Sequence, residues 1–282
     1  MTQRINDVVI YGNVYNIDTL HCFFSGGKDS ALACYIAKQV ADVRGWEFRL
    51  VHIDTTVYIK ETREYVYKYA QWLGAELVVI RPERTFREYA ERYGMWPSLY
   101  PFRFRWCMRV LKLKPTIRYL QENYRPGDLV VLGIRGSESR FREKLYKEVF
   151  TDHIYGGKVK VKLWMPLLRM DDSVVTKLMR QYGIPENPTW YKLGFSGECL
   201  CLAGTPIHRI ALLMRHYPEE FQQLLEIDQA INRSRKSGKP SAPFRLVQIG
   251  LTLPEFYHRV KTAATLDSYI HYGKSCEGSC ML

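Results

Sequence analysis

The sequence predicts an α/β protein, built on a Rossmann-like, doubly wound and mostly parallel sheet with a small helical C-terminal subdomain. Apolar, strand-like runs at residues 19–24, 48–54, 77–80 and 129–134 alternate with amphipathic segments of helix length. This alternation favours parallel strands, because a crossover helix must return the chain to the same edge of the sheet. We expect about five strands, with the ligand at their carboxyl ends.

The later part of the chain has a different pattern. The run Val159–Trp164 alternates lysine with apolar residues, which predicts an edge strand with one solvated face. After Pro166 the pattern predicts a helix over residues 172–182, then a stretch punctuated by proline and glycine, then more helix. We therefore expect an α/β domain over residues 1–165 and a mainly helical, cysteine-containing subdomain over residues 166–282.

Composition and charge restrict the class of protein. No apolar run approaches the roughly 20 residues of a membrane helix, and residues 1–7 lead into no apolar signal core. We expect a cytoplasmic protein with no membrane partner. The net charge of +12 favours an anionic partner such as a nucleotide or a nucleic acid. Seven cysteines without an export signal predict metal, redox or buried roles.

The glycine-rich turn after the first strand carries the strongest functional signal. Its residues are Ser25, Gly26, Gly27, Lys28, Asp29 and Ser30. Two glycines let backbone N–H groups approach a ligand, and the following helix N-terminus and Lys28 attract negative charge. The spacing differs from that of the Gly-x-x-x-x-Gly-Lys-Ser/Thr loop. The turn is therefore predicted to bind phosphate in another way.

A second polar group follows the strand at residues 129–134. Arg135, with Arg140 or Arg142, is expected at the carboxyl end of that strand, where open α/β sheets bind ligands. Guanidinium groups suit phosphate and sulfate oxygens because they donate in a planar fork. The alternative for Arg135 is a surface salt bridge to Glu138.

The loop sequence SGGKDS resembles the pyrophosphate loop of the ATP pyrophosphatase and phosphoadenosine phosphosulfate (PAPS) reductase superfamily. Residues 51–56 resemble the family's second-strand motif. Residues 132–140 resemble its motif Gly-Ile-Arg-x-x-Glu-Ser-x-x-Arg, with Arg140 one place early and Arg142 one place late. The resemblance extends from about residue 20 to 205 and implies the family's fold. It also implies that ATP or a PAPS-type adenine nucleotide binds with Mg²⁺ at the loop and at His52, Asp54, Gly133, Arg135, Glu138 and Arg140.

The resemblance also implies a reaction. Members that cleave ATP between its α- and β-phosphates keep Gly-Gly-Lys-Asp-Ser, whereas dedicated sulfonucleotide reductases generally lack the lysine, so the intact loop favours ATP. Lys28 and the amides of Gly26 and Gly27 would stabilise the pyrophosphate leaving group. Asp29 would help to place the metal, and Arg135 completes the expected catalytic set.

The cysteines separate into three groups. The surroundings of Cys107, Cys199 and Cys201 resemble iron–sulfur ligand sites of the family, although Met108 stands where some members have a second cysteine. This implies a 4Fe-4S cluster with Cys280 as a candidate fourth ligand; zinc and no metal are the alternatives. Cys276 and Cys280 also suit the tail nucleophile of PAPS reductases. Cys22 and Cys34 are expected to be buried, inert thiols.

The sequence thus predicts an enzyme that activates an acceptor for sulfur transfer. One alternative is a phosphoadenylyl- or adenylylsulfate reductase that releases sulfite, and another is a non-catalytic nucleotide- or nucleic-acid-binding module. Arginines and aromatic rings alternate over residues 94–106, which suits either a nucleic-acid acceptor, tRNA or DNA, or packing of the loop. A sulfur or electron donor protein is an expected partner, and a homo-oligomer is left open.

Overall fold

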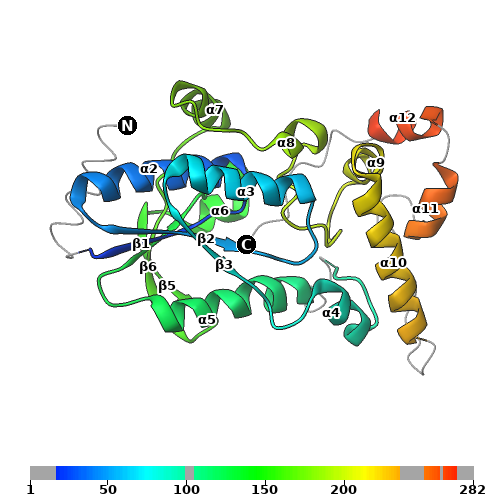
Figure 1. The fold of residues 1–282 in the computed structure, drawn as a ribbon, viewed down its shortest axis with the longest axis horizontal. Coiled ribbons are helices and arrows are strands. Elements are labelled where there is room, and N and C mark those ends of the chain that lie inside the picture. The colour runs from blue at the N-terminus through cyan, green and yellow to red at the C-terminus, as the bar shows by residue number, and fades with distance from the viewer. Residues whose placement is uncertain (1–16, 99–104, 236–250, 261–262, 272–282) are drawn as a thin grey trace.

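The computed structural model describes residues 17–98, 105–235, 251–260 and 263–271. Its centre is a six-stranded sheet of order β3-β2-β1-β4-β6-β5 (Figure 1). The strands are β1 (Thr19–Phe23), β2 (Glu47–Ile53), β3 (Glu76–Ile80), β4 (Leu129–Leu132), β5 (Phe150–Tyr155) and β6 (Val159–Trp164). All neighbouring pairs are parallel except β5 with β6. The predicted doubly wound, mostly parallel sheet is confirmed.

Helices cover both faces of the sheet, with α2 and α3 on one side and α5 on the other (Figure 1). The helices of the first part of the chain are α2 (Lys28–Arg44), α3 (Lys60–Leu73), α4 (Phe86–Tyr93), α5 (Lys114–Asn123) and α6 (Arg140–Leu145). A π-helical turn, η2 (Met108–Leu113), precedes α5, and a 3₁₀ turn, η3 (Gly136–Glu138), precedes α6. The later helices are α7 (Asp172–Gln181), α8 (Pro188–Leu193), α9 (Ile207–His216), α10 (Pro218–Arg235), α11 (Leu253–Arg259) and α12 (Ala263–His271).

Alternation along the strands divides the core between the two faces. Leu129 and Val131 of β4 lie in the buried cluster that includes α2 and α3, whereas Val130 packs with Tyr119 and Leu120 of α5. Successive side chains of a strand point to opposite faces, so a strand covered on both sides reads as a continuous apolar run. This explains why the sequence LVVL identified β4.

The expected edge position of Val159–Trp164 is wrong. This segment is β6, and it lies between β4 and the antiparallel edge strand β5, which the sequence did not predict. Lys160 forms an ion pair with Asp152 of β5, with the Nζ and Oδ2 atoms 2.9 Å apart. The alternating lysines therefore mark the solvated face of a strand that is paired on both sides. The sheet has six strands rather than about five.

Cys22 and Cys34 are also corrected, because the structure joins them in a disulfide rather than leaving two inert thiols. Cys22 lies on β1 and Cys34 on α2, and both are fully buried. The expected burial of both residues is confirmed. Their pairing arises when α2 packs across β1, and each element's own apolar pattern does not show it.

The helical character expected after Pro166 is confirmed. Leu167, Val175 and Met179 share the buried cluster of α2, while α9 to α11 contribute to a second cluster with α4. Trp96 links the α4 region to α10 by donating from Nε1 to Oδ1 of Asp228 at 2.8 Å. The division of the chain at residues 165 and 166 stays a prediction. Within the described segments, no helix has the length and apolarity that a membrane crossing requires.

A buried polar chain fixes β1 to α5 and to the turn before β4. His21 contacts the hydroxyl of Tyr119 through Nδ1 at 2.8 Å and Oδ2 of Asp128 through Nε2 at 3.1 Å. Burial raises the pKa of Tyr119 to about 12, so its hydroxyl keeps the proton that it donates. Burial alone would raise the pKa of Asp128, but hydrogen bonds from His21 and from the amide of Arg125 hold it below its usual value.

We predict that Asp128→Asn destabilises the fold by roughly 1–3 kcal/mol near neutral pH, because the variant breaks a buried charge-assisted hydrogen bond. A carboxylate with a lowered folded pKa stabilises the fold above its unfolded pKa, and this stabilisation is lost as the pH falls through the folded pKa. The difference between wild type and variant in urea unfolding should therefore narrow toward acid pH. Asp152→Asn, in an exposed ion pair, should cost about 1 kcal/mol or less. If the free energy of unfolding of Asp128→Asn differed from that of wild type by the same amount at every pH, Asp128 would not be the titrating group.

Candidate active site

The glycine-rich turn lies between the end of β1 and the start of α2, at the carboxyl edge of the sheet. Gly26 has a φ of +79°, a left-handed conformation that favours glycine, and Gly27 is the N-cap of α2. The Ser30 hydroxyl closes the turn by donating to the carbonyl of Gly27 at 2.8 Å, and its Oγ lies 3.0 Å from that of Ser25. Since Gly27 has no side chain to cap α2, the first-turn amides are available to an anion.

Gly133 allows the end of β4 to lie directly against this turn. A Cβ atom built on Gly133 would lie 2.6 Å from the backbone nitrogen of Ser30 and 2.7 Å from the carbonyl oxygen of Asp29. Both of these neighbours are backbone atoms and cannot rotate away. Gly133 therefore packs closely against the phosphate loop, and its contact with a nucleotide stays a prediction.

Asn187 holds the other side of the loop. Its Nδ2 donates to the carbonyls of Gly26 and Ser196, both at 2.9 Å, and its Oδ1 accepts from the amide of Thr189 at 3.0 Å. The side chain is buried and also caps α8. The connector that carries Asn187 therefore helps to fix the conformation of the phosphate loop.

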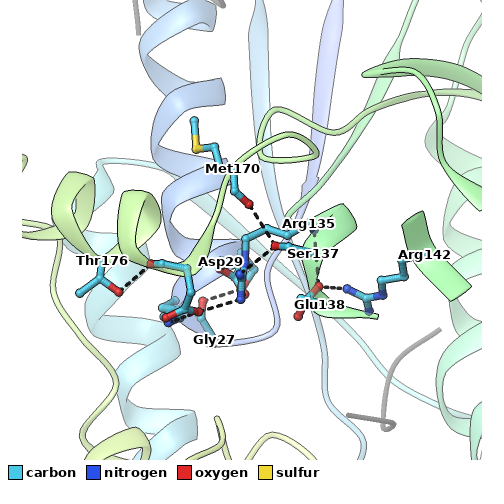
Figure 2. Close-up of polar contacts among 11 residues, drawn as sticks. Gly27, Asp29, Arg135, Ser137, Glu138, Arg142, Met170 and Thr176 are labelled. Atoms are coloured by element: carbon cyan, nitrogen blue, oxygen red, sulfur yellow. Dashed lines mark hydrogen bonds and ion pairs between the residues drawn. The ribbon is translucent and has the colours of Figure 1, made fainter. Parts of the chain in front are cut away.

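Lys28 and Arg135 meet at one carboxylate oxygen beside the loop. Arg135 also contacts Asp29 of α2 (Figure 2). Oδ1 of Asp172 accepts from Nζ of Lys28 at 2.6 Å and from Nη2 of Arg135 at 2.9 Å. Nε of Arg135 donates to Oδ1 of Asp29 at 2.9 Å, and Nη2 donates to Oδ2 at 3.3 Å. The three predicted catalytic residues, Lys28, Asp29 and Arg135, are therefore brought together. Asp172, from α7, is a fourth member that the sequence did not single out.

Burial and charge act in opposite directions on these carboxyl groups. Burial raises the pKa of Asp29, although the neighbouring guanidinium of Arg135 lowers it. For Asp172, burial alone would raise the pKa, but the hydrogen bond and charge of Lys28, together with Arg135, hold it below its usual value. Asp172 is therefore the group of this cluster that keeps its negative charge most readily.

Glu138 does not bind the guanidinium of Arg135 in a surface salt bridge, which was the alternative expectation. Its Oε2 pairs with Nη1 of Arg142 and accepts from the backbone amide of Arg135 at 3.4 Å. Both members of the Glu138–Arg142 pair are buried, and burial raises the pKa of Glu138 despite Arg142. The pair shapes the turn that presents Arg135. The side chain of Arg140 lies outside the described residues.

His52 and Asp54 stand at the carboxyl end of β2, next to the loop. Nδ1 of His52 donates to the carbonyl of Phe24 at 2.8 Å, and burial lowers the pKa of His52, which favours the neutral ring. Asp54 accepts from Nε of Arg81 at 3.0 Å and from the amide of Thr56 at 2.9 Å. Both residues are thus at the predicted edge of the sheet, and Asp54 is engaged by Arg81.

The three free cysteines of the described residues share one buried cluster. Cys107 and Cys201 are buried in it, and Cys199 packs against it. A hydrogen bond to Cys201, together with burial, raises the pKa of Cys199 well above its usual value. Nearby, Nζ of Lys112 lies 2.5 Å from Oε1 of Glu198.

The described side chains do not by themselves complete an iron–sulfur or zinc site. Over the described ranges, no three His, Cys, Asp or Glu side chains form a group that could hold a metal ion. Cys276 and Cys280 lie outside the described residues.

For the aromatic rings of residues 94–106, either stacking on bases or packing of the loop was expected, and two of the rings pack in the core. Trp96 and Trp106 are 1% and 3% exposed, and both contact Phe86 in the core. Residues 99–104, which carry the rest of the arginine-aromatic pattern, lie outside the described residues. A different ring lies near the loop, because the Trp190 centroid is 5.3 Å from Nζ of Lys28.

The family model of the phosphoadenosine phosphosulfate reductase domain matches residues 19–197, which is more than half of the chain. The chain belongs to this family. The match includes the phosphate loop, the β4 turn with Arg135, and Asn187, and it extends past Cys107 to the edge of the Cys-x-Cys segment.

Two uncharacterized proteins of Methanocaldococcus jannaschii are also similar in sequence. One is 37% identical over 125 residues, which is 44% of this chain and 28% of the relative. The other is 33% identical over 117 residues, or 41% of this chain and 22% of the relative. The matched part of the chain thus spans less than a third of the length of these relatives.

Among solved structures, the PAPS reductase of Candida auris in a phosphate complex aligns with a TM-score of 0.49 at 19% identity, covering 68% of this chain and 85% of that one. FMN adenylyltransferase of Candida glabrata with FAD and inorganic pyrophosphate gives a TM-score of 0.48 at 12% identity, covering 68% and 60%. NMN synthetase of Francisella tularensis gives 0.45 at 14% identity, covering 87% and 97%.

We predict that Gly133→Ala destabilises the protein by roughly 1–3 kcal/mol, because the added methyl group must push the backbone of Ser30 and Asp29 away from β4. Gly27→Ala is the comparison, since its Cβ would meet atoms at 3.5 Å or more. Urea unfolding of both variants tests the contact. Equal stability losses would show that β4 and the loop are not tightly packed.

Proposed function

We propose that this chain binds an adenine nucleotide at the loop and cleaves ATP between the α- and β-phosphates to activate an acceptor. The observation that carries the proposal is the convergence of Lys28 and Arg135 at the N-terminus of α2, beside a glycine turn. Two cations and a set of helix amides at one point are suited to a polyphosphate.

In the proposed reaction, a nucleophilic atom of the acceptor attacks the α-phosphorus. The bond from that phosphorus to the bridging oxygen breaks, giving adenylated acceptor and pyrophosphate. Negative charge develops on the departing pyrophosphate, where the ammonium of Lys28 and the amides at the start of α2 stabilise it. Asp29 holds the guanidinium of Arg135 in orientation through two hydrogen bonds.

Mg²⁺ accompanies ATP in such reactions and supplies further positive charge to the phosphates. Both oxygens of Asp29 are engaged by Arg135, and the described residues hold no group of three metal-binding side chains. The ion would therefore be held mainly by the phosphates, with few protein ligands, as is common for Mg²⁺.

We further propose that the acceptor is activated for sulfur transfer. This is supported by the family match and by the two contacting thiols of Cys199 and Cys201. An anaerobic preparation should be analysed for iron and acid-labile sulfide, in the wild type and in a Cys199→Ser, Cys201→Ser double variant. Iron and sulfide that are lost in the double variant would support a cluster. A colourless wild-type protein without iron would exclude the cluster.

The second candidate is a sulfonucleotide reductase, which the family match favours. Lys28 argues against it, because a lysine beside the polyphosphate position suits the cleavage of ATP. Sulfite release from PAPS or adenylylsulfate with a dithiol reductant, combined with no pyrophosphate release from ATP, would establish this candidate and reject the first.

We predict that Lys28→Ala lowers pyrophosphate release from ATP by about 10²–10³-fold, because the variant removes a charge that stabilises the leaving group. Far-UV circular dichroism should be unchanged. Lys38→Ala is the matched control on the same helix: Lys38 forms an exposed pair with Asp42, and its loss should leave activity within about twofold. Nucleotide cleavage retained by Lys28→Ala would reject the assigned role.

A further inference from the structure

The carboxylate of Asp172 occupies a position that a phosphate oxygen of a ligand would suit. Oδ1 of Asp172 receives hydrogen bonds from Lys28, at the start of α2, and from Arg135, after β4. One anionic oxygen between an ammonium and a guanidinium is the contact that a phosphate oxygen would make at this point. The carboxylate comes from the first residue of α7, so a third element contributes to the cluster.

We propose that Asp172 is a specificity-determining residue of the nucleotide site, which holds the position of a phosphate group until a ligand displaces it. This inference rests on the proposed function, because it concerns the same loop. It assigns Asp172 a part in selecting the ligand.

Exposure indicates which member of the cluster moves. The side chain of Arg135 is 9% exposed and that of Asp29 is 17% exposed, whereas that of Asp172 is 61% exposed. Asp172 therefore closes the cluster on the solvent side, and rotation of its side chain alone removes it. Its backbone carbonyl still accepts from Oγ1 of Thr176 at 2.9 Å, so α7 need not unwind.

Arg135 and Lys28 remain oriented when the side chain of Asp172 rotates away. Asp29 still binds Nε and Nη2 of Arg135, and the Nζ of Lys28 still lies 5.3 Å from the ring of Trp190. The two cations thus keep neighbours that hold them in place. The ligand replaces one carboxylate and does not have to assemble the site.

Displacement makes binding depend on the charge of the ligand. The contacts of a monophosphate with Lys28 and Arg135 are little stronger than those of the Asp172 carboxylate. The carboxylate is part of the chain, so it pays no entropy of association, whereas a free monophosphate does. A polyphosphate has further charged oxygens for the α2 amides, which Asp172 does not occupy, so less of its binding depends on displacing the carboxylate. Asp172 therefore weakens the binding of AMP and inorganic phosphate more than the binding of ATP or pyrophosphate.

The test compares Asp172→Asn with Asp171→Asn. Asp171 is the exposed N-cap of α7 and makes no side-chain capping bond, so both variants remove one negative charge at adjacent positions. Binding of inorganic phosphate, AMP, pyrophosphate and ATP is measured by calorimetry with EDTA present at low ionic strength. Asp172→Asn should lower the dissociation constants of AMP and inorganic phosphate about tenfold, and those of pyrophosphate and ATP by a smaller factor. Asp171→Asn should change each dissociation constant by about twofold or less.

Four results would overturn the inference. Weaker binding in Asp172→Asn would show that the carboxylate organises the cations instead of competing for them. Equal changes in both variants would assign the effect to long-range charge. If ATP binding requires Lys28 but Asp172→Asn behaves as Asp171→Asn, the inference fails and the proposed function stands. If no variant binds any of these anions, both fail. Asp172→Ala, measured alongside with unfolding curves, excludes an effect specific to asparagine.

Discussion

The close contact between the end of β4 and the first turn of α2 is the constraint on which the site depends. With no side chain at Gly133, the two backbones approach to a distance that any Cβ would prevent. This approach carries Arg135, two residues later, to within hydrogen-bonding distance of Asp29 on α2. The cations of the site thus come from two segments more than 100 residues apart, which follow the paired strands β1 and β4.

The electrostatics of the cluster follow from the same proximity. Two cations beside a helix N-terminus repel each other, and Asp29 and Asp172 offset this repulsion. Asp29 is largely buried and binds Arg135 with both oxygens, so it acts as a fixed support. Asp172 is exposed at the edge and binds through one oxygen, so it is the replaceable partner. The different exposures give two chemically identical groups different roles.

The loop is also held from outside the sheet. Asn187 bonds the carbonyl of Gly26 and the backbone at Ser196, and thereby links the phosphate loop to the segment that leads to Cys199 and Cys201. Glu198 in that segment pairs with Lys112, and its carbonyl accepts from Thr55 at 2.8 Å. Through these bonds the thiol pair and the nucleotide loop belong to one connected framework.

The sequence by itself determined the elements whose signals are local. The apolar runs predicted β1 to β4, since a strand covered on both faces is apolar throughout. The alternation of lysine with apolar residues predicted β6, and the SGGKDS turn predicted the phosphate loop. The tertiary structure decided every relation that depends on which surfaces meet. It placed β6 inside the sheet, joined Cys22 to Cys34, buried Trp96 and Trp106, and brought Asp172 to Lys28. An aspartate at a helix start is common, so its sequence context carries no sign of a partner 144 residues away.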